Sequence, residues 1–309
     1  RSPVPHSSGN WGDLIDPRVK KLFKDEFAQL PDMVGTLYNV QSSSDAYEIS
    51  SESGALDDFA EFSGTVSYGS QNQGYDVRAT HVEFTKGIQI ERKLYDDDRH
   101  GLWQAKPVEL ANAANRTRQK HAARLLNNAF SVDSMFYSHS EGVALCSDSH
   151  TTTSGASTSV GFDNLTTSAL SAVAYSAARI QFQGFVDDVG NKIMSMPDEL
   201  WIPIDLFEVA QEIVGSAGKV DTANNNINVH KGGVKLMPSE NGWNYLTDTN
   251  NWFITDSKLR KRFCIWYERV PVEFAMAEEL DTLIAKWRAY MRYSNKYQNW
   301  RFILGAQVS

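Results

Sequence analysis

The stretch PVELANAANRTRQKHAARLLNNAF, residues 107–130, carries the longest helical pattern in the chain. Apolar residues recur in it at steps of three and four, the spacing that places side chains on one face of a helix. This face consists of Val108, Ala111, Ala114, Ala122, Leu125, Leu126 and Ala129, and Arg118 interrupts it. Pro107 suits a first-turn position. The stretch therefore predicts a rod of about 35 Å, a spine longer than a small compact domain needs.

The opposite face of this predicted helix is basic. It carries Arg116, Lys120 and Arg124 against a single acid, Glu109. An amphipathic core helix with a solvated basic face is the simplest interpretation. The functional interpretation is that this basic face meets acidic residues of a binding partner.

Composition narrows the class of protein. The chain has 309 residues, 41% of them hydrophobic, which is enough to fill one large core or two ordinary ones. Its net charge of −8 argues against a dedicated nucleic-acid binder, which needs clustered Lys and Arg. The two cysteines, Cys146 and Cys264, form no ligand-spaced motif, so neither a disulfide framework nor a zinc site is expected. No apolar run reaches the roughly 20 residues that span a bilayer, so we expect no membrane partner.

Upstream of the spine, the sequence period changes from helical to alternating. THVEFTKGIQIERKL, residues 80–94, places Val82, Phe84, Ile88 and Ile90 on one face, with Lys86 as the exception, and predicts a strand. Tyr47 and Ile49 begin a candidate partner strand. Between them lie more than 20 residues that alternate glycine with Phe59, Phe62, Tyr68 and Tyr75. We interpret this passage as a long two-stranded hairpin that leaves the domain and packs on a neighbour; a functional or disordered loop is the alternative.

The N-terminal residues 1–12 are rich in Pro, Ser and Gly and predict an arm that orders only against something else. A short helix is expected after them, capped by Asp16 and begun by Pro17.

Downstream of the spine, helices and strands alternate, which indicates a mixed α/β domain. We predict a helix over residues 167–186, capped by Thr166 or Thr167, and another after Asp205. The apolar face of the helix over residues 167–186 consists of Leu170, Val173, Ala174, Ala177, Ile180 and Phe185. LWIPI, GVKLMP, NYLTD and NWFITDS are expected strands. The segment 286–305 reads as a closing hairpin with its turn at Ser294–Asn295–Lys296.

Motifs for catalysis and ligand binding are weak. GASTSVG, residues 155–161, lacks the lysine of a phosphate-binding loop, and no G-x-S-x-G elbow occurs. Asp148 and His150 lie together in SDSH, but catalytic triads are assembled from distant segments. The acidic runs Asp96–Asp98 and Asp187–Asp188 lack the spacing of calcium loops. We therefore predict no catalytic residue, no metal and no cofactor; an enzyme would have to use Asp148 and His150.

Several stretches in one order resemble a known family. They are YDVRATHVEFTKGIQIERKLYDDD running into RTRQKHAARLLNNAFS, then VALCSDSH, LWIPIDLFEVAQEIV, TANNNINV and NWFITD. Together they resemble the major capsid proteins of tailed bacteriophages, and within them the Mu-like prophage major head subunits.

The resemblance implies an α+β Johnson fold, also called Hong Kong 97-like. Its parts would be an N-terminal arm (1–35), an extended loop with flanking strands (36–93), a peripheral domain with the spine helix (94–130), an axial domain (131–275) and C-terminal peripheral strands (276–309). The implied function is structural: pentamers and hexamers that tile an icosahedral head around double-stranded DNA, bound without sequence specificity. Encapsulin-like compartments share the fold and are the alternative.

The resemblance also implies partners and a place in the cell. Portal, scaffold and cement proteins are possible partners, the location is the virion capsid, and assembly takes place in the host cytoplasm. Some members crosslink the extended loop through a lysine, but residues 45–85 contain none, so we predict no crosslink at the loop tip.

The residues expected to meet an adjacent subunit follow from charge and aromatic content. The acids Asp57, Asp58 and Glu61 of the loop would pair with Arg116, Arg118 or Arg124 of the spine. Phe59, Phe62, Tyr68 and Tyr75 are the candidate anchors, because aromatic residues dominate interface energetics.

Overall fold

The computed structural model describes residues 20–91, 102–218, 226–238, 242–279 and 283–309, together with positions 93 and 97. The predicted helix caps Asp16 and Pro17, the arm before them, and Asp96 and Asp98 of the acidic run lie outside these residues. Residues 20–29 are helical, as predicted.

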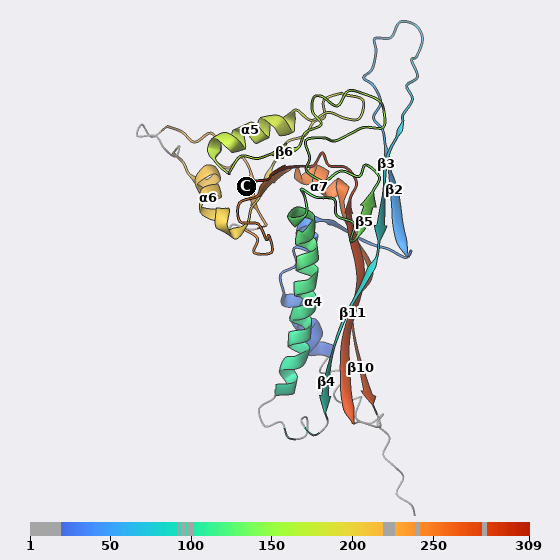
Figure 1. Cartoon of the computed structure of the whole chain (residues 1–309), viewed down its shortest axis with the longest axis vertical. Coiled ribbons are helices and arrows are strands. Elements are labelled where there is room, and N and C mark those ends of the chain that lie inside the picture. Colours follow the sequence, from blue (N-terminus) through green and yellow to red (C-terminus); the bar gives the residue numbers. More distant parts are fainter. Residues whose placement is uncertain are drawn as a thin grey trace, which may run out of the picture.

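The spine is helix α4, Leu102–Asn127, which runs along the long axis of the molecule (Figure 1). Its predicted apolar face is confirmed, since Ala111, Ala122 and Leu126 are almost completely buried. The predicted start was wrong, because the helix begins before Pro107. Pro107 therefore lies inside the helix, beyond its first turn, where it removes one backbone N–H donor from the helical hydrogen bonds.

A four-stranded sheet lies beside the spine in the order β1-β10-β11-β4. Its strands are β1 (Asn39–Ser42), β4 (Val82–Glu91), β10 (Cys264–Glu279) and β11 (Ile284–Tyr297). The predicted strand over 80–94 is thus confirmed as β4, but its predicted partner was wrong: β4 pairs with β11, and the strand that begins at Tyr47 pairs with residues 73–80. A short helix, α2 (Val34–Leu37), leads into β1.

The predicted closing hairpin was wrong. Ser294, Asn295 and Lys296 are buried inside β11 and form no turn. Their polar side chains have partners there, because Ser294 Oγ lies 2.9 Å from His81 Nδ1 and Asn295 Nδ2 donates to the His121 carbonyl at 3.2 Å. The antiparallel partner of β11 is β10, and the expected domain border at 275 falls inside that strand.

A second sheet forms the predicted hairpin, in the order β2-β3-β5. Its strands are β2 (Tyr47–Ser53), β3 (Gln73–Thr80) and β5 (Tyr137–His139). Only His81 separates β3 from β4, so one nearly continuous strand belongs first to the hairpin and then to the long sheet. His81 is buried, and its Nε2 lies 3.0 Å from Ser43 Oγ.

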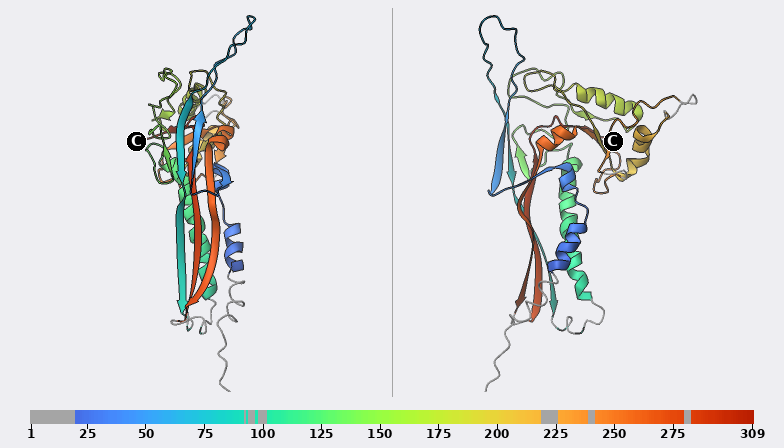
Figure 2. Two further views of the ribbon diagram at one scale, coloured as in Figure 1. Left: turned by 90° about the vertical axis from the view of Figure 1, so that its right-hand side faces the viewer. Right: turned by 180° about the vertical axis from the view of Figure 1, so that it is seen from behind.

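A third sheet, in the order β6-β12-β9-β7-β8, is placed to one side above the spine with α5 and α6 (Figures 1 and 2). Its strands are β6 (Leu165–Thr166), β7 (Glu199–Trp201), β8 (Lys235–Met237), β9 (Trp252–Thr255) and β12 (Ile303–Ala306). The helices are α5 (Ala172–Gln183), a 3-10 turn η1 (Ile204–Leu206), α6 (Phe207–Gly215) and α7 (Ser257–Phe263). This confirms the strands in LWIPI, GVKLMP and NWFITDS, whereas NYLTD forms none.

Two helix predictions in this region were wrong in detail. Ser171 caps α5 by accepting the Ala174 N–H at 3.1 Å, since Thr166 belongs to β6. The buried face of α5 carries Tyr175, Ala178 and Phe182, while Val173 and Ile180 of the predicted face are exposed. Asp205 lies in η1, and α6 starts without a side-chain cap.

A buried ion pair joins this third sheet to the start of the long one. Arg260 of α7 donates to both carboxylate oxygens of Glu199 in β7, at 2.8 and 2.7 Å. Arg260 also donates to the carbonyl of Thr36 in α2 at 2.7 Å. Both charged residues are more than nine-tenths buried, and among the described residues each is the other's only salt-bridge partner.

His121 makes the folded chain sensitive to acid. Its Nδ1 lies 2.8 Å from the Tyr293 hydroxyl, and burial together with the charges of Arg124 and Lys120 lowers its pKa to about 4. An unfolded histidine titrates near pH 6.5, so below that pH the unfolded chain binds a proton that the folded chain does not. Stability is therefore complete above about pH 6.5 and falls as the pH drops towards 4.

We expect urea unfolding of the unassembled chain to show a loss of about 1–2 kcal/mol from this residue between pH 7.5 and 4.5, after allowance for its partial exposure. The variant His121→Gln, which does not titrate, is the control and should lose less stability over the same range. Equal losses in the two proteins would contradict the prediction.

Candidate docking surface

The most exposed aromatic side chains lie on the connection between β2 and β3, residues 54–72, which projects from the body (Figures 1 and 2). We call this connection the extended loop. Phe59, Phe62 and Tyr68 are exposed by 102%, 73% and 93%. Exposure of three aromatic rings on one projecting segment costs hydrophobic free energy, which a partner surface would recover. The projection was thus predicted correctly, but the projecting part is a loop without strands, while the two strands of the predicted hairpin, β2 and β3, pair beside the body.

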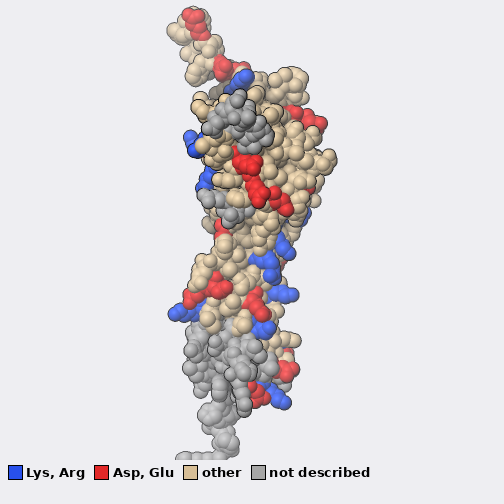
Figure 3. Space-filling view, turned by 90° about the vertical axis from the view of Figure 1, so that its left-hand side faces the viewer, with Lys and Arg blue, Asp and Glu red and all other residues tan. Residues whose placement is uncertain are grey.

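The extended loop is also acidic. Asp57, Asp58 and Glu61 are all exposed and lie among its aromatic residues. Figure 3 shows the carboxylates at the far end of the projection, away from the basic side chains of the body. The loop thus presents an apolar surface with negative charge beside it.

Tyr75, the fourth expected anchor, lies in β3 against the body of the same chain. Its hydroxyl is 2.6 Å from Thr151 Oγ1 and its ring centroid is 6.1 Å from that of His139. It is half-buried and already has contacts, unlike the rings on the loop.

Of the three spine arginines, only Arg116 is exposed. Arg118 is buried and pairs with Glu268 of β10, and its Nη2 lies 3.7 Å from Asp32. Arg124 binds both carboxylate oxygens of Asp133, at 2.7 and 2.9 Å. Carboxylates of their own chain therefore already hold both arginines: Asp133, nine residues along the chain, holds Arg124, and residues from more distant segments hold Arg118. The contact of these arginines with another subunit stays a prediction.

A groove of about 360 Å³ lies between the spine helix and β4, the edge strand of the long sheet. Apolar side chains form its floor: Phe84, Leu110, Ala114 and Met291. Lys86, Arg116 and Lys120 also line it, so the groove combines apolar side chains with basic groups. Sequence reasoning missed the groove because it forms between two elements; its one signal was Lys86 on the apolar side of β4.

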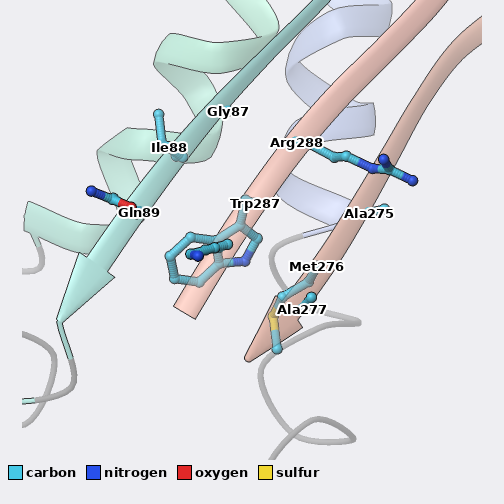
Figure 4. Close-up of a pocket in the computed structure, with 9 residues that line it drawn as sticks. Gly87, Ile88, Gln89, Ala275, Met276, Ala277, Trp287 and Arg288 are labelled. Atoms are coloured by element: carbon cyan, nitrogen blue, oxygen red, sulfur yellow. The ribbon is translucent and has the colours of Figure 1, made fainter. Parts of the chain in front are cut away.

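A wider hollow of about 660 Å³ lies at the far end of the same sheet, where Figure 4 shows Trp287 and Arg288 of β11 between β4 and β10. Its other lining residues are Gly87, Ile88, Gln89, Ala275, Met276, Ala277 and Lys286. Among these described residues there is no carboxylate, histidine, cysteine or hydroxyl. The one lining side chain that could serve as a nucleophile or base is Lys286, and its amine is held in an ion pair with Glu279 at 2.6 Å.

The polar cluster SDSH does not assemble a catalytic group. His150 is buried and stacks on Trp300, and its ring nitrogens lie 3.0 Å from Glu141 Oε1 and 3.1 Å from Asn164 Oδ1. Burial alone would raise the pKa of Glu141, but the hydrogen bond and charge of His150 keep it below its usual value. Asp148 is exposed, away from this pair. Both nitrogens of His150 are thus already used in holding the loop together.

The described residues bring together no group of three or more side chains suited to holding a metal ion. Asp187 instead holds a turn, since its Oδ1 accepts the N–H groups of Val189 and Asn191 at 3.0 and 2.8 Å. Within the described ranges, no helix has both the length and the apolar character needed to cross a membrane.

Comparisons with known proteins agree with this arrangement. Solved structures with the same fold include a chain of Microbacterium phage Oxtober96, with 10% identity, a TM-score of 0.51 and coverage of 91% of this chain and 93% of that chain. A chain of the procapsid of bacteriophage JBD30 has 14% identity and a TM-score of 0.51, with coverage of 97% and 76%. One from the mature capsid of bacteriophage PhiM1 has 8% identity and a TM-score of 0.52, with coverage of 88% and 85%.

These similarities confirm the Hong Kong 97-like α+β fold. No curated protein matches the chain by sequence. The family described as phage capsid protein, however, matches residues 74–305, well over half of the chain. The match does not favour the encapsulin alternative. The chain accordingly belongs to the phage capsid protein family and is a structural major capsid protein of a virion, not an enzyme.

Proposed function

We propose that this protein forms the pentamers and hexamers of an icosahedral tailed-phage head that encloses double-stranded DNA. The observation that carries the proposal is the extended loop, whose exposed rings have no partner in the described part of their own chain. The stretches resembling Mu-like prophage head subunits suggest the closer relatives within the family.

The loop would lie over an adjacent subunit and enter the groove between α4 and β4 there. Phe59 and Phe62 would cover the apolar floor, and Asp57, Asp58 and Glu61 would face the basic groups of the groove. Each exposed ion pair would contribute only about 0.2–1 kcal/mol. Burial of an aromatic side chain contributes about 1.5–3 kcal/mol, so the rings would supply most of the affinity.

The arrangement of sheets supports a refined domain scheme. The peripheral domain would contain α4 and the whole long sheet, including all of β10. The axial domain would contain the third sheet with α5 and α6, and the final strand β12 belongs to that sheet. The N-terminal arm of residues 1–35 and the loop region of 36–93 would connect neighbouring subunits.

Contact with DNA would be weak and independent of sequence, which fits the net charge of −8. A container that held its DNA tightly would hinder packaging and release. Portal, scaffold and cement proteins would be further partners, and assembly would take place in the host cytoplasm.

Light scattering of the purified protein, with negative-stain images of the same sample, tests the proposal. We expect megadalton shells, or pentamers and hexamers of the 34.6 kDa chain. Shells from infected cells should retain nuclease-resistant double-stranded DNA. A monomer that stays monomeric at high concentration, even with its scaffold co-expressed, would contradict the proposal, and shells filled with protein cargo would point to a compartment.

A further inference from the structure

The extended loop leaves the body at a narrow root. The last strand pair of the hairpin is Ser53 with Gln73, and the Gly54 N–H then donates to the Asn72 carbonyl at 2.8 Å. Beyond this point, residues 56–71 make no hydrogen bond or ion pair with the body in the part of the chain that the structure describes. The direction of the loop is therefore decided at the root.

One carboxylate from a distant segment touches this root. Asp188 Oδ1 accepts the Ala55 N–H at 2.8 Å. Its other oxygen lies so close to Gly54 that a Cβ there would be 2.6 Å from Oδ2, and also 2.5 Å from the Asn72 carbonyl. Only glycine lets the chain approach Asp188 this closely.

Asp188 is itself held in place. The turn that carries it is closed by the contacts of Asp187 described above, and Gly190 adopts the positive φ of 98° that such a turn requires. The Asp188 carbonyl accepts the Thr152 hydroxyl at 3.0 Å. The hollow beside the carboxylate measures about 20 Å³, room for roughly one water molecule, so the side chain has little space to turn away.

The segment next to Thr152 holds the second strand of the hairpin. Thr153 Oγ1 donates to the Gln73 carbonyl at 2.8 Å, and Thr151 contacts Tyr75 as described above. Residues 151–153 therefore touch β3 on one side and Asp188 on the other. Both sides of the root are therefore held by the same connected residues, one side by Asp188 and the other by residues 151–153.

We propose that Asp188 acts as a clamp that sets the direction of the extended loop, and that the loop pivots about Gly54 and Asn72 when this contact is lost. The clamp belongs to the single chain and does not depend on the proposed assembly. It would present the aromatic rings in a fixed direction before any partner arrives, which lowers the entropic cost of association.

Distance measurements between two spin labels test the clamp in the unassembled full-length chain. The labels are attached through Ser63→Cys on the loop and Lys258→Cys on α7, both exposed positions. The native cysteines Cys146 and Cys264 are buried, and burial raises their pKa values, so they should not react with the label.

The variant Asp188→Ala should broaden the distance distribution about twofold, because a released loop samples many directions on the nanosecond to microsecond scale. Asp188→Asn, which keeps the acceptor for Ala55, should retain the original width. Asp148→Ala removes an exposed carboxylate from a nearby loop and is the matched control.

An unchanged width in Asp188→Ala, with native circular dichroism, would overturn the clamp. If that variant fails to fold, Gly54→Ala provides a second test, since its methyl group would collide with the carboxylate as well as with the Asn72 carbonyl; a width equal to the original would again overturn the proposal. Neither readout involves subunit association, so failure of the clamp is distinct from failure of the capsid assignment.

Discussion

Replacement of Phe59 and Phe62 by serine should abolish shell formation while leaving the subunit folded. The two rings are exposed by 102% and 73% and contribute nothing to the core of their own chain. On a neighbour they would bury apolar surface worth about 3–6 kcal/mol together, which corresponds to roughly a hundredfold to ten-thousandfold in the association constant of each contact. Because every subunit repeats the contact, the effect on the shell is larger than on a single pair.

Light scattering and sedimentation of the double variant measure the loss, and circular dichroism confirms the fold. The matched control is Phe59→Leu with Phe62→Leu, which keeps apolar side chains of similar size and should still assemble. Normal shells from the serine variant would show that the loop aromatics do not anchor the contact.

The largest loss of stability is expected from Glu199→Ala. This change leaves the Arg260 guanidinium, which is 2% exposed, without its carboxylate. Removing one partner of a buried ion pair costs about 3–5 kcal/mol, because the remaining charge has lost its water and its counter-ion. Glu199 also accepts the Thr255 hydroxyl at 2.8 Å, so a second buried polar group loses its acceptor.

Urea unfolding followed by tryptophan fluorescence measures this cost on the unassembled chain. Glu109→Ala is the control, since Glu109 and Lys106 form an exposed pair at 3.3 Å and the change should cost less than about 1 kcal/mol. Similar losses in the two variants would contradict the importance of burial.

Local periodicity accounts for what could be predicted from the sequence. The spine and β4 follow their apolar patterns, because one face of the spine is buried along most of its length and one face of β4 is partly buried. The projection of the loop could also be predicted, since an acidic and aromatic passage with regular glycines cannot fill a core. The loop residues that the sequence predicted to be exposed are therefore exposed in the structure.

The errors share a different cause, the presence of a partner far along the chain. Ser294 to Lys296 carry turn-forming residue types, yet β11 continues through them because distant groups satisfy their side chains. Arg118 is polar but buried, because Glu268 neutralises it from another strand. On α5, Val173 and Ile180 of the predicted apolar face are exposed, because Tyr175 and Phe182 are the residues that pack into the core. These contacts join residues far apart in the chain, so a local sequence pattern cannot reveal them.

The near continuity of β3 and β4 has a mechanical consequence. A pull on the extended loop passes along β3 and through His81 into β4. There it acts parallel to the strand, across the ladder that pairs β4 with β11 from Val82 to Glu91. The hydrogen bonds of an antiparallel pair lie perpendicular to the strands, so they share such a shearing load instead of opening one after another. The loop is thus attached to its subunit in the geometry that best resists tension.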